Sequence, residues 1–366
     1  MRVAFCADIH IGAPNTNLQE LMGCFEMMIS SSDLIVIGGD ILDAKYHTSS
    51  ENISLLLDLM DYITPMIFRS NKILRLIYGT QSHDGYPQLQ ILNPYTAMMN
   101  FRIISHVSEE TILKNKILYI PEEIIGSKQE YYAETLFSDK TYDYIFGHGV
   151  IAEGMPMVRE SKVKKVRSVP IFRSEELSKK CLFHCCFGHY HRHTDIDRRV
   201  HYVGSLTRFR HAEPEPKGWF QIQNSRIDFI ENPWSPIYTE HKITCQDYTP
   251  DDFQAKISSI LAEFTLNKSS RDRLKFHFYL DRRSPDAMVY ADIIRTLCKL
   301  DGVSYAIKDT NELVLQEDPV VEKYDYILDQ SIPIKDKINR YNESEFEGEI
   351  DQSLLQQYLD RVKVQT

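Results

Sequence analysis

Five apolar runs of the sequence are each followed by side chains that can do chemistry. These side chains are carboxylates, imidazoles and one hydroxyl, and four of the five sets stand next to a glycine. They are, in chain order, Asp8 and His10 after residues 2–7, Asp40 after 34–37, Ser82, His83 and Asp84 after 73–77, His148 after 144–146, and His189 and His191 after 182–187. Imidazole and carboxylate together suit divalent metals such as Mn, Fe or Zn, so the pattern predicts a metal site.

The spacing within these sets indicates how the ligands converge. Asp8 and His10 are two residues apart, as are His189 and His191, and such pairs point the same way if the backbone between them is extended. Asp40, placed centrally, can bridge two ions. Two metals about 3.5–4 Å apart clamp the attacking and leaving oxygens of a phosphoryl transfer and lower the pKa of bound water. The predicted chemistry is therefore phosphoester hydrolysis.

The elements that would position these residues alternate in type. Residues 2–7, 34–37 and 73–77 read as strands, and helical patterns at 18–29 and 53–68 lie between them, which predicts a mainly parallel sheet covered by helices. Further apolar runs come at 117–120, 144–146 and 182–187. After these, 199–203, 218–222 and 227–230 are expected to be antiparallel strands that close a second sheet. Ligands bind outside the carboxyl ends of strands in α/β sheets.

Length and composition limit the class of protein. The chain has 366 residues, 43% hydrophobic and 26% charged, which is ordinary for two globular domains. No apolar run reaches the roughly 20 residues of a membrane span, and the N-terminus does not read as a signal peptide. Seven cysteines in such a chain are expected to be reduced thiols of a cytoplasmic protein. A net charge of −10 argues against strong unaided binding to nucleic acid.

A second domain is expected after a composition shift at "ENPWSPIY", residues 231–238. The helical patterns 250–264 and 285–300 and the alternating stretch 274–280 predict a small α/β domain within residues 236–320. The remaining segment, 321–366, carries an apolar stripe at helical spacing between residues 350 and 362. This amphipathic helix either packs on its own domain or binds a partner.

The motifs "ADIHIG", "IGGDILD", "SHD", "FGHG" and "GHYH" together resemble the calcineurin-like metallophosphoesterase superfamily. Within it the chain is similar to the SbcD-type nuclease subunit of the SbcCD DNA repair complex. That closer likeness rests on "DLIVIGGDILDA", which includes the extra Asp43, and on "HYVGSLTRFRHAEPEPKGWFQI". The resemblance implies a two-layered β-sandwich flanked by helices over residues 1–235, a DNA-capping α/β domain over 236–320, and a C-terminal helix.

The same resemblance implies roles for individual residues and two divalent ions, Mn first, with Mg or Fe as alternatives. One ion would be held by Asp8, His10 and His191, and the other by His148 and His189, with Asp40 bridging both. His83 matches the catalytic histidine, and Asp84 would orient it. The family places an Asn ligand where this chain has Ser82, so Ser82, Gln81 or a water would fill that position. Because a Ser hydroxyl is a weaker ligand, we expect a looser second metal rather than a dead site.

The function implied is Mn-dependent DNA cleavage in repair or recombination, gated by an SbcC-type coiled-coil ATPase that grips the C-terminal helix. A homodimer within a heterotetramer, in a bacterial cytoplasm or a phage-infected host, goes with that assignment. Two alternatives stay open: a phosphatase or small-molecule phosphodiesterase of the same superfamily, and a non-enzymatic scaffold with a decayed site. Candidate DNA contacts are Lys162, Lys164 and Lys165, together with Arg192, Arg208 and Arg210. The alternative for the basic stretch that contains the three lysines is a solvated loop without a role in binding.

Neutralising Lys162, Lys164 and Lys165 together is expected to weaken DNA binding and to flatten its dependence on salt concentration. The reason is that every phosphate contact that is lost reduces the number of condensed counterions released when DNA binds. Titration of duplex DNA with the triple variant at several salt concentrations measures both quantities. An unchanged affinity and an unchanged salt slope would mean that this stretch does not contact DNA.

Overall fold

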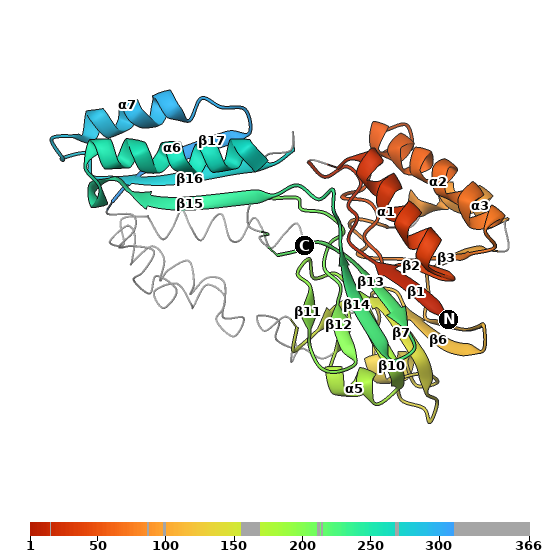
Figure 1. The fold of residues 1–366 in the computed structure, drawn as a ribbon. Coiled ribbons are helices and arrows are strands. Elements are labelled where there is room, and N and C mark those ends of the chain that lie inside the picture. The colour runs from red at the N-terminus through yellow and green to blue at the C-terminus, as the bar shows by residue number, and fades with distance from the viewer. Residues whose placement is uncertain are drawn as a thin grey trace, which may run out of the picture. The chain divides into compact units, whose positions relative to one another are not determined.

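The computed structural model describes residues 1–14, 16–85, 88–97, 100–154, 169–210, 213, 215–267 and 271–310. This part of the chain is an α/β structure, as the sequence predicts, with parallel and antiparallel strand pairs and with helices between strands (Figure 1). Lys162, Lys164, Lys165 and the whole segment 321–366, with its expected helix, lie outside the described residues.

The first sheet carries the N-terminal strands. Its order is β14-β13-β1-β2-β3-β4, and the four strands from β1 to β4 are parallel neighbours. The bounds are β1 (Arg2–Cys6), β2 (Leu34–Ile37), β3 (Ile73–Ile77), β4 (Phe101–Ile104), β13 (Gly218–Gln223) and β14 (Arg226–Glu231). The helices α1 (Leu18–Ser31) and α2 (Glu51–Arg69) connect β1 to β2 and β2 to β3, followed by η1 (Gln88–Leu92) and α3 (Asn93–Thr96). The predicted parallel sheet covered by helices is confirmed.

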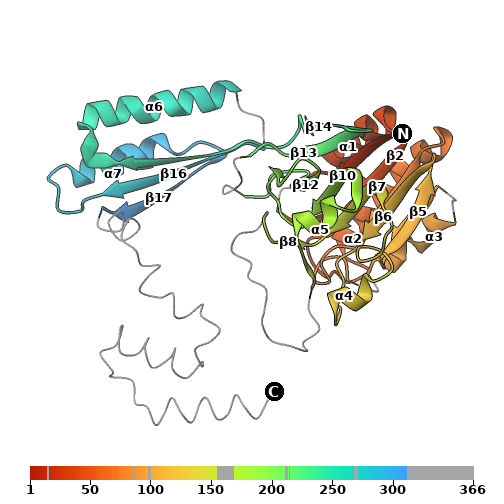
Figure 2. The same ribbon diagram turned by 90° about the horizontal axis from the view of Figure 1, so that it is seen from below.

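The second sheet, which Figure 2 shows from another side, has the order β11-β12-β10-β7-β6-β5. Its strands are β5 (Ser108–Ile112), β6 (Asn115–Ile120), β7 (Tyr142–His148), β10 (Cys181–Gly188), β11 (Thr194–Asp195) and β12 (Val200–Tyr202). The short helices α4 (Lys128–Tyr131) and α5 (Ser174–Ser178) and the two-stranded pair of β8 (Val150–Ile151) and β9 (Ile171–Phe172) accompany it. Strands β6, β7, β10 and β12 are parallel to one another.

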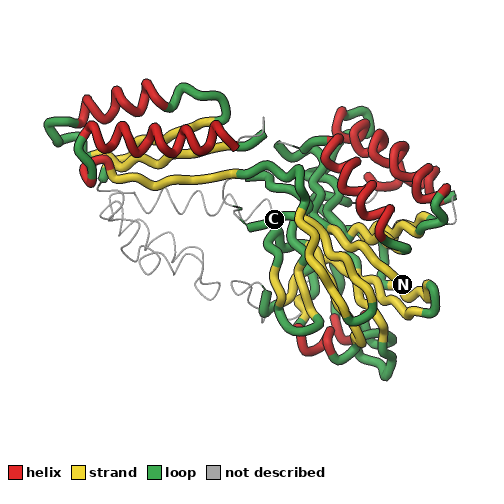
Figure 3. Tube along the Cα trace, viewed as in Figure 1, coloured by secondary structure: helices red, strands yellow, loops and turns green. Residues whose placement is uncertain are grey.

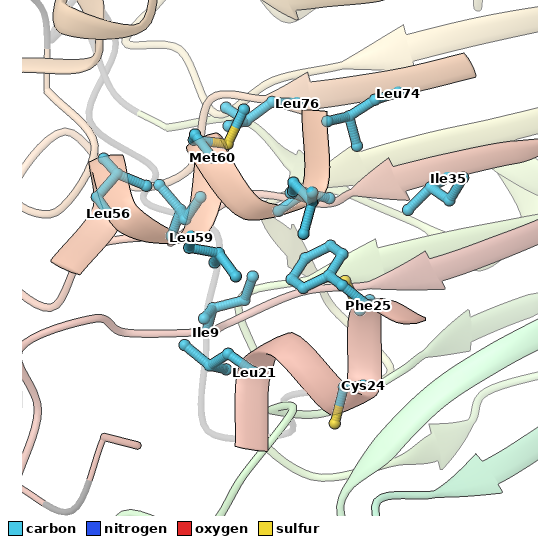
Figure 4. Close-up of a cluster of buried hydrophobic side chains, with 14 of the residues drawn as sticks. Ile9, Leu21, Cys24, Phe25, Ile35, Leu56, Leu59, Met60, Leu74 and Leu76 are labelled. Atoms are coloured by element: carbon cyan, nitrogen blue, oxygen red, sulfur yellow. The ribbon is translucent and has the colours of Figure 1, made fainter. Parts of the chain in front are cut away.

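The two sheets face each other across an apolar layer. Alternation along β1 sends Val3 and Phe5 into this layer, and sends Ala4 and Cys6 to the opposite face. The facing side of the second sheet contributes Phe146 and other side chains of β6 and β7. Helices α1 and α2 cover the outer face of the first sheet (Figure 4), while α4 and α5 lie on the outer face of the second.

One expectation about the late strands is wrong. β13 and β14 form a hairpin that joins the first sheet, with β13 antiparallel to β1, instead of closing the second sheet. β12 does belong to the second sheet, but it is parallel to β10. Alternating apolar and polar residues reveal that a segment is a strand with one buried face, and do not reveal which neighbour it pairs with.

The chain divides into two compact units. The first comprises Met1–Glu240 with Leu266–Lys275, and the second comprises His241–Thr265 with the residues from Phe276 onward. A three-stranded sheet, β15-β16-β17, is accompanied by α6 (Pro250–Asn267) and α7 (Ala287–Leu297), drawn red in Figure 3. Its strands are β15 (Tyr238–Thr244), β16 (Arg273–Leu280) and β17 (Val303–Asp309), with η2 (Cys245–Asp247) after the first.

Two observations concern the chain as far as it is described. None of its described helices combines the length and the apolar character needed to cross a membrane. All seven cysteines fall within the described ranges, and each is buried and free of any disulfide.

A half-buried charged pair links a strand of the first sheet to a strand of the second. Arg75 of β3 donates from Nε and Nη2 to the two carboxylate oxygens of Glu110 on β5, at 2.8 and 2.6 Å. Its Nη1 donates to the carbonyl oxygens of Leu74 and Asn100. Burial alone would raise the pKa of Glu110, but the guanidinium of Arg75 outweighs it and lowers the pKa. The Tyr119 hydroxyl also donates to Oε2 of Glu110, so removing Arg75 takes away the only cation that bonds this carboxylate among the described contacts and leaves one neutral donor.

Replacing Arg75 by Met is expected to lower the free energy of unfolding by about 1–3 kcal/mol, because it leaves the half-buried Glu110 carboxylate with the Tyr119 hydroxyl as its remaining donor among the described contacts. Urea unfolding measures the loss. Pairing lowers the folded-state pKa of Glu110, so its contribution is present above the ordinary glutamate value of about 4.3 and fades as the pH falls through the folded value. The difference between wild type and variant should shrink accordingly in acid.

Lys140→Met is the matched control, because Lys140 pairs with the neighbouring Glu109 in an exposed position. Its loss should stay below about 1 kcal/mol. Equal losses in the two variants would show that the pair between the sheets stabilises no more than a surface pair.

Candidate metal centre

Most of the predicted ligands, together with Thr80 and Glu122, converge at one edge of the two sheets, because each lies at or after the carboxyl end of a parallel strand. The first sheet supplies its residues from the loops after three strands, and the second sheet does the same. The set is Asp8 and His10 after β1, Asp40 after β2, Thr80 and His83 after β3, Glu122 after β6, His148 at the end of β7, and His189 and His191 after β10. Groups of three from this set place their ligand atoms within 4.8 Å of one another.

The loops after β1 and β2 are held together by backbone hydrogen bonds. The N–H of Asp8 donates to the carbonyl of Gly39 at 3.0 Å, and the N–H of His10 donates to the carbonyl of Asp40 at 3.0 Å. These bonds extend the pairing of β1 with β2 past the ends of the two strands. Asp8 and Asp40 are therefore fixed relative to each other by the backbone.

The expected extended backbone at the paired ligands is wrong. Asp8, His10 and Asp40 have φ values of 52°, 50° and 51°, and His189 has 96°, all in the left-handed region. Each such residue costs roughly 1–3 kcal/mol unless its surroundings hold it. The side chains converge because the chain turns at the ligands, and not because residues two apart lie on one face of a strand.

Two glycines allow the loops to approach this closely. Gly39 has φ of 91°, and a Cβ there would lie 2.4 Å from Nδ1 of His148. At Gly79 a Cβ would lie 2.2 Å from both the backbone nitrogen and Oδ1 of Asp40. Any other residue at these two positions would push Asp40 or His148 out of place.

The first group consists of Asp8, His10 and His191. The Nε2 atoms of His10 and His191 lie 3.0 Å apart, so they need either one proton between them or a shared cation. Asp8 is fully buried and accepts hydrogen bonds from the backbone N–H of His189 at both carboxylate oxygens. These are the three residues that the resemblance assigns to one ion.

Asp40 lies between this group and His148. Its Oδ2 is 3.3 Å from Nε2 of His148 and 3.9 Å from Nε2 of His10. Nδ1 of His148 lies 2.7 Å from the carbonyl oxygen of Gly38, and it donates there in the tautomer that leaves Nε2 free. Asp8, Asp40 and His148 form a second group of candidate ligands, so Asp40 is central as predicted.

The third group is His148, His189 and Glu122, of which Glu122 was missed by the sequence reasoning. Oε2 of Glu122 lies 2.9 Å from Nδ1 of His189 and 3.8 Å from Nε2 of His148. Glu122 comes two residues after the end of β6, so the rule that finds polar groups after strands would have found it. Thr80 was missed too, although its hydroxyl lies 3.4 Å from Nε2 of His148.

Ser82 is not brought to the cluster. The N–H groups of His83 and Asp84 both donate to the carbonyl of Thr80, so residues 80–84 form a tight turn. In such a turn residues 80 and 83 share a face, while Gln81 and Ser82 are exposed on the other side. At this turn the side chain that contacts the cluster is therefore that of Thr80, and not that of Ser82 or Gln81.

His83 lies at the rim of the cluster, but Asp84 does not orient it. The Nδ1 atom of His83 is hydrogen-bonded to the carbonyl oxygen of Asp43, and its ring stands edge-on to His10 at 4.9 Å. The carboxylate of Asp84 instead accepts from the backbone N–H groups of Ile41, Leu42 and Gly79. Asp84 thus ties the loop after β3 to the loop after β2, which positions Asp40.

Burial and the pairing of Asp40 with His148 dominate the electrostatics of the cluster. Burial lowers the pKa of His10 to about 3, so its imidazole is neutral and can act as a ligand. Burial raises the pKa of Asp8. Burial opposes the charged forms of both Asp40 and His148, but their mutual attraction outweighs it, which lowers the pKa of Asp40 and raises that of His148.

Three buried polar atoms of the cluster lack a well-directed hydrogen bond, namely Nδ1 of His10, Nδ1 of His191 and Oε2 of Glu122. Each has a group of possible opposite charge nearby: Oδ1 of Asp43 at 3.2 Å, Oε1 of Glu213 at 3.7 Å and Nδ1 of His189 at 2.9 Å, respectively. Such atoms are rare in folded proteins, and a bound ion is one explanation for them. The donor set of imidazoles and carboxylates is that of divalent transition metals. The described residues therefore fit metal ions.

The predicted DNA contacts fare unevenly. Arg208 is buried and donates to the carbonyl oxygens of Glu213, Pro236 and Glu215, so its guanidinium is already used within the protein. Its assignment as a DNA contact is wrong for that reason. Arg192 pairs with Glu215, and the largely exposed Arg210 pairs with Glu213.

No known protein-family model and no curated protein matches this chain. Among solved structures, TT1561 of Thermus thermophilus has 9% identity and a TM-score of 0.39, covering 63% of this chain and 98% of its own. GAP50, the anchor in the inner membrane complex of Plasmodium, has 14% identity and a TM-score of 0.39, covering 65% and 87%. Likenesses this distant carry no argument about fold or function.

Asp84→Asn is expected to destabilise the protein by about 1–3 kcal/mol, because an amide NH₂ would face N–H groups that now donate to a carboxylate. Thermal unfolding measures the loss. Asp43→Asn is the control, since its side chain is partly exposed and receives no such set of backbone donors among the described contacts. A stable Asp84→Asn variant with impaired catalysis would instead support the original role beside His83.

Proposed function

We propose that this chain is a metal-dependent phosphoesterase of the metallophosphoesterase superfamily, and that it is an SbcD-type nuclease that cleaves DNA phosphodiesters with Mn²⁺. The observation that carries the proposal is Asp40, which lies between Asp8 and His10 on one side and His148 on the other. A carboxylate shared by two ligand groups is the arrangement that a dinuclear phosphoesterase needs.

The arrangement of the fold supports the finer assignment. Two facing sheets with helices on their outer faces agree with the β-sandwich that the resemblance implies for residues 1–235. The motif residues Asp8, His10, Asp40, His148, His189 and His191 all come together at one edge. A decayed scaffold would be expected to have lost several of them, so their presence argues against that alternative.

The residues divide into holders of metal and a proton donor. Asp8, His10 and His191 would hold one ion and His148 and His189 the other, with Asp40 between them. Two divalent ions bound there supply positive charge for the phosphoryl oxygens and a nucleophile near neutral pH. His83 keeps Nδ1 on the Asp43 carbonyl, so Nε2 remains available to protonate the leaving oxygen or stabilise the phosphorane.

The remaining assignments belong to the same proposal. The small α/β region within residues 236–320 would cap DNA, and the segment 321–366 would bind an SbcC-type ATPase within a heterotetramer built on a homodimer. A partner ATPase that supplies most of the DNA affinity is consistent with the net charge of −10. The compartment would be a bacterial cytoplasm or that of a phage-infected host.

A phosphatase or small-molecule phosphodiesterase is the second candidate, and one observation favours it. Arg208 is used inside the protein, and Arg192 and Arg210 both pair with glutamates, so the described part of the chain offers few unpaired cations near the cluster for a DNA backbone. A small phosphoester would need fewer such contacts than a duplex does.

Cleavage of linear duplex and hairpin DNA by the purified chain tests the two candidates, with Mn²⁺, Mg²⁺ or EDTA present. His83→Ala is expected to lower the Mn²⁺-dependent rate by about 10²–10⁴-fold, the usual contribution of a general acid. His106→Ala is the matched control, because His106 is exposed and bonds Glu123. Turnover of a generic phosphomonoester without DNA cleavage would support the phosphatase, and inactivity on both substrates with metal bound would contradict both candidates.

A further inference from the structure

We propose that Glu122 and Thr80 complete the half of the metal centre that His148 and His189 begin, and thereby make it a site with a carboxylate of its own. The inference rests on the proposed metal-dependent function. It replaces the expectation from sequence, in which the neutral hydroxyl of Ser82 leaves the second ion loosely held.

Glu122 is a buried carboxylate whose contacts make sense around a cation. Only 6% of it is exposed, and its Oε2 accepts no hydrogen bond. Its ion-pair partners among the described residues are two imidazoles, with Nδ1 of His189 at 2.9 Å and Nε2 of His148 at 3.8 Å. A carboxylate buried this deeply loses most of its hydration, and a nearby positive charge is needed to compensate for that loss.

The hydroxyl of Thr80 faces the same point. Its Oγ1 donates to Oδ2 of Asp40 at 3.2 Å, which uses its single proton. The remaining lone pairs face Nε2 of His148 at 3.4 Å and Nδ1 of His189 at 3.5 Å. When the neutral ring of His148 donates from Nδ1 to Gly38, its Nε2 presents a lone pair to the same point, so a cation bound there would be met by Nε2 and by Oγ1 of Thr80.

The backbone delivers both residues to this point together. The N–H of Glu122 donates to the carbonyl of Tyr78 at 3.2 Å, which joins the segment after β6 to the segment after β3. Thr80 comes two residues after Tyr78, and its own N–H donates to Oδ1 of Asp40 at 2.6 Å. The two sheets thus contribute one oxygen ligand each through a direct link between them.

With Glu122 as a ligand, the proposed metal centre carries one more negative charge than the sequence predicts. Asp8 serves the first group, Glu122 serves the other, and Asp40 is shared, so three carboxylates face the four positive charges of two divalent ions. An amide or hydroxyl in place of Glu122 would leave one negative charge fewer. We therefore expect the second ion to be held tightly.

Metal binding by the intact chain tests this inference. The purified protein is stripped with EDTA and titrated with Mn²⁺, with calorimetry for affinity and elemental mass spectrometry for the number of ions. Wild type is expected to bind two ions. Glu122→Gln should weaken one of them by at least about tenfold, and Thr80→Val should weaken the same ion, because each removes an oxygen ligand from it.

Two variants serve as matched controls. Glu123→Gln changes the adjacent carboxylate, which accepts from His106 and Tyr131 away from the cluster, and should leave both affinities unchanged. Ser82→Ala should also change nothing, because Ser82 is exposed.

Thermal unfolding separates a ligand from a merely structural residue. Without metal, Glu122 has only the imidazoles of His189 and His148 as ion-pair partners among the described residues, and the stability of Glu122→Gln in EDTA gives the baseline for the effect of metal. The upward shift of Tm on adding Mn²⁺ should be smaller in this variant than in wild type, in line with its weaker binding. A Glu122 with a merely structural role would leave this metal-dependent shift of Tm unchanged.

The outcomes that overturn the inference are distinct from those that overturn the function. Two ions of unchanged affinity in both Glu122→Gln and Thr80→Val would refute this inference and leave the phosphoesterase proposal intact. A loss on Ser82→Ala would restore the interpretation from sequence. Wild type that binds no Mn²⁺ would refute the metal-dependent function, and the inference with it.

Discussion

The structure of this chain depends on holding carboxylates and imidazoles together where water barely reaches. Asp8 and Asp40 are buried side by side, and like charges this close are costly unless donors and cations surround them. The donors come from the backbone: the N–H of His189 for Asp8, and that of Thr80 for Asp40. Those N–H groups point inward because the strand ends of two sheets are locked at one edge. The geometry of the site therefore depends directly on how the two sheets pack.

The rest of the first unit follows from that requirement. Four candidate ligands have left-handed backbone, and Gly39 and Gly79 have no side chain, so that loops from different strands can touch. Strain of this kind persists when the surroundings over-determine it. The surroundings here are a continuous apolar layer between the sheets, reinforced by the pair of Arg75 with Glu110. The packing of the interior thus compensates for the backbone strain at the edge where the chemistry would occur.

Much of this was predictable from sequence, and the failures have physical causes. Strands β2 and β3 begin and end where their apolar runs do, because runs bounded by polar groups and glycine leave little choice. The expectation for Ser82 fails because spacing along the chain does not reveal a turn at Thr80. Glu122 follows β6 without a neighbouring glycine or histidine, so its sequence context carries no metal-site motif. The fate of Arg208 could not be foreseen, since composition does not show which carbonyl oxygens need a donor.

The seven cysteines have a practical consequence. Each thiol is buried, and burial raises the pKa of Cys6 to about 12 and that of Cys298 to about 11. Alkylating reagents attack the thiolate, so these positions react when the surrounding structure opens. Cys6 ends the central strand β1 of the first unit, and Cys298 caps α7 of the second. The rate at which Cys6 and Cys298 are alkylated in the native protein would therefore report how often the first and the second unit open locally.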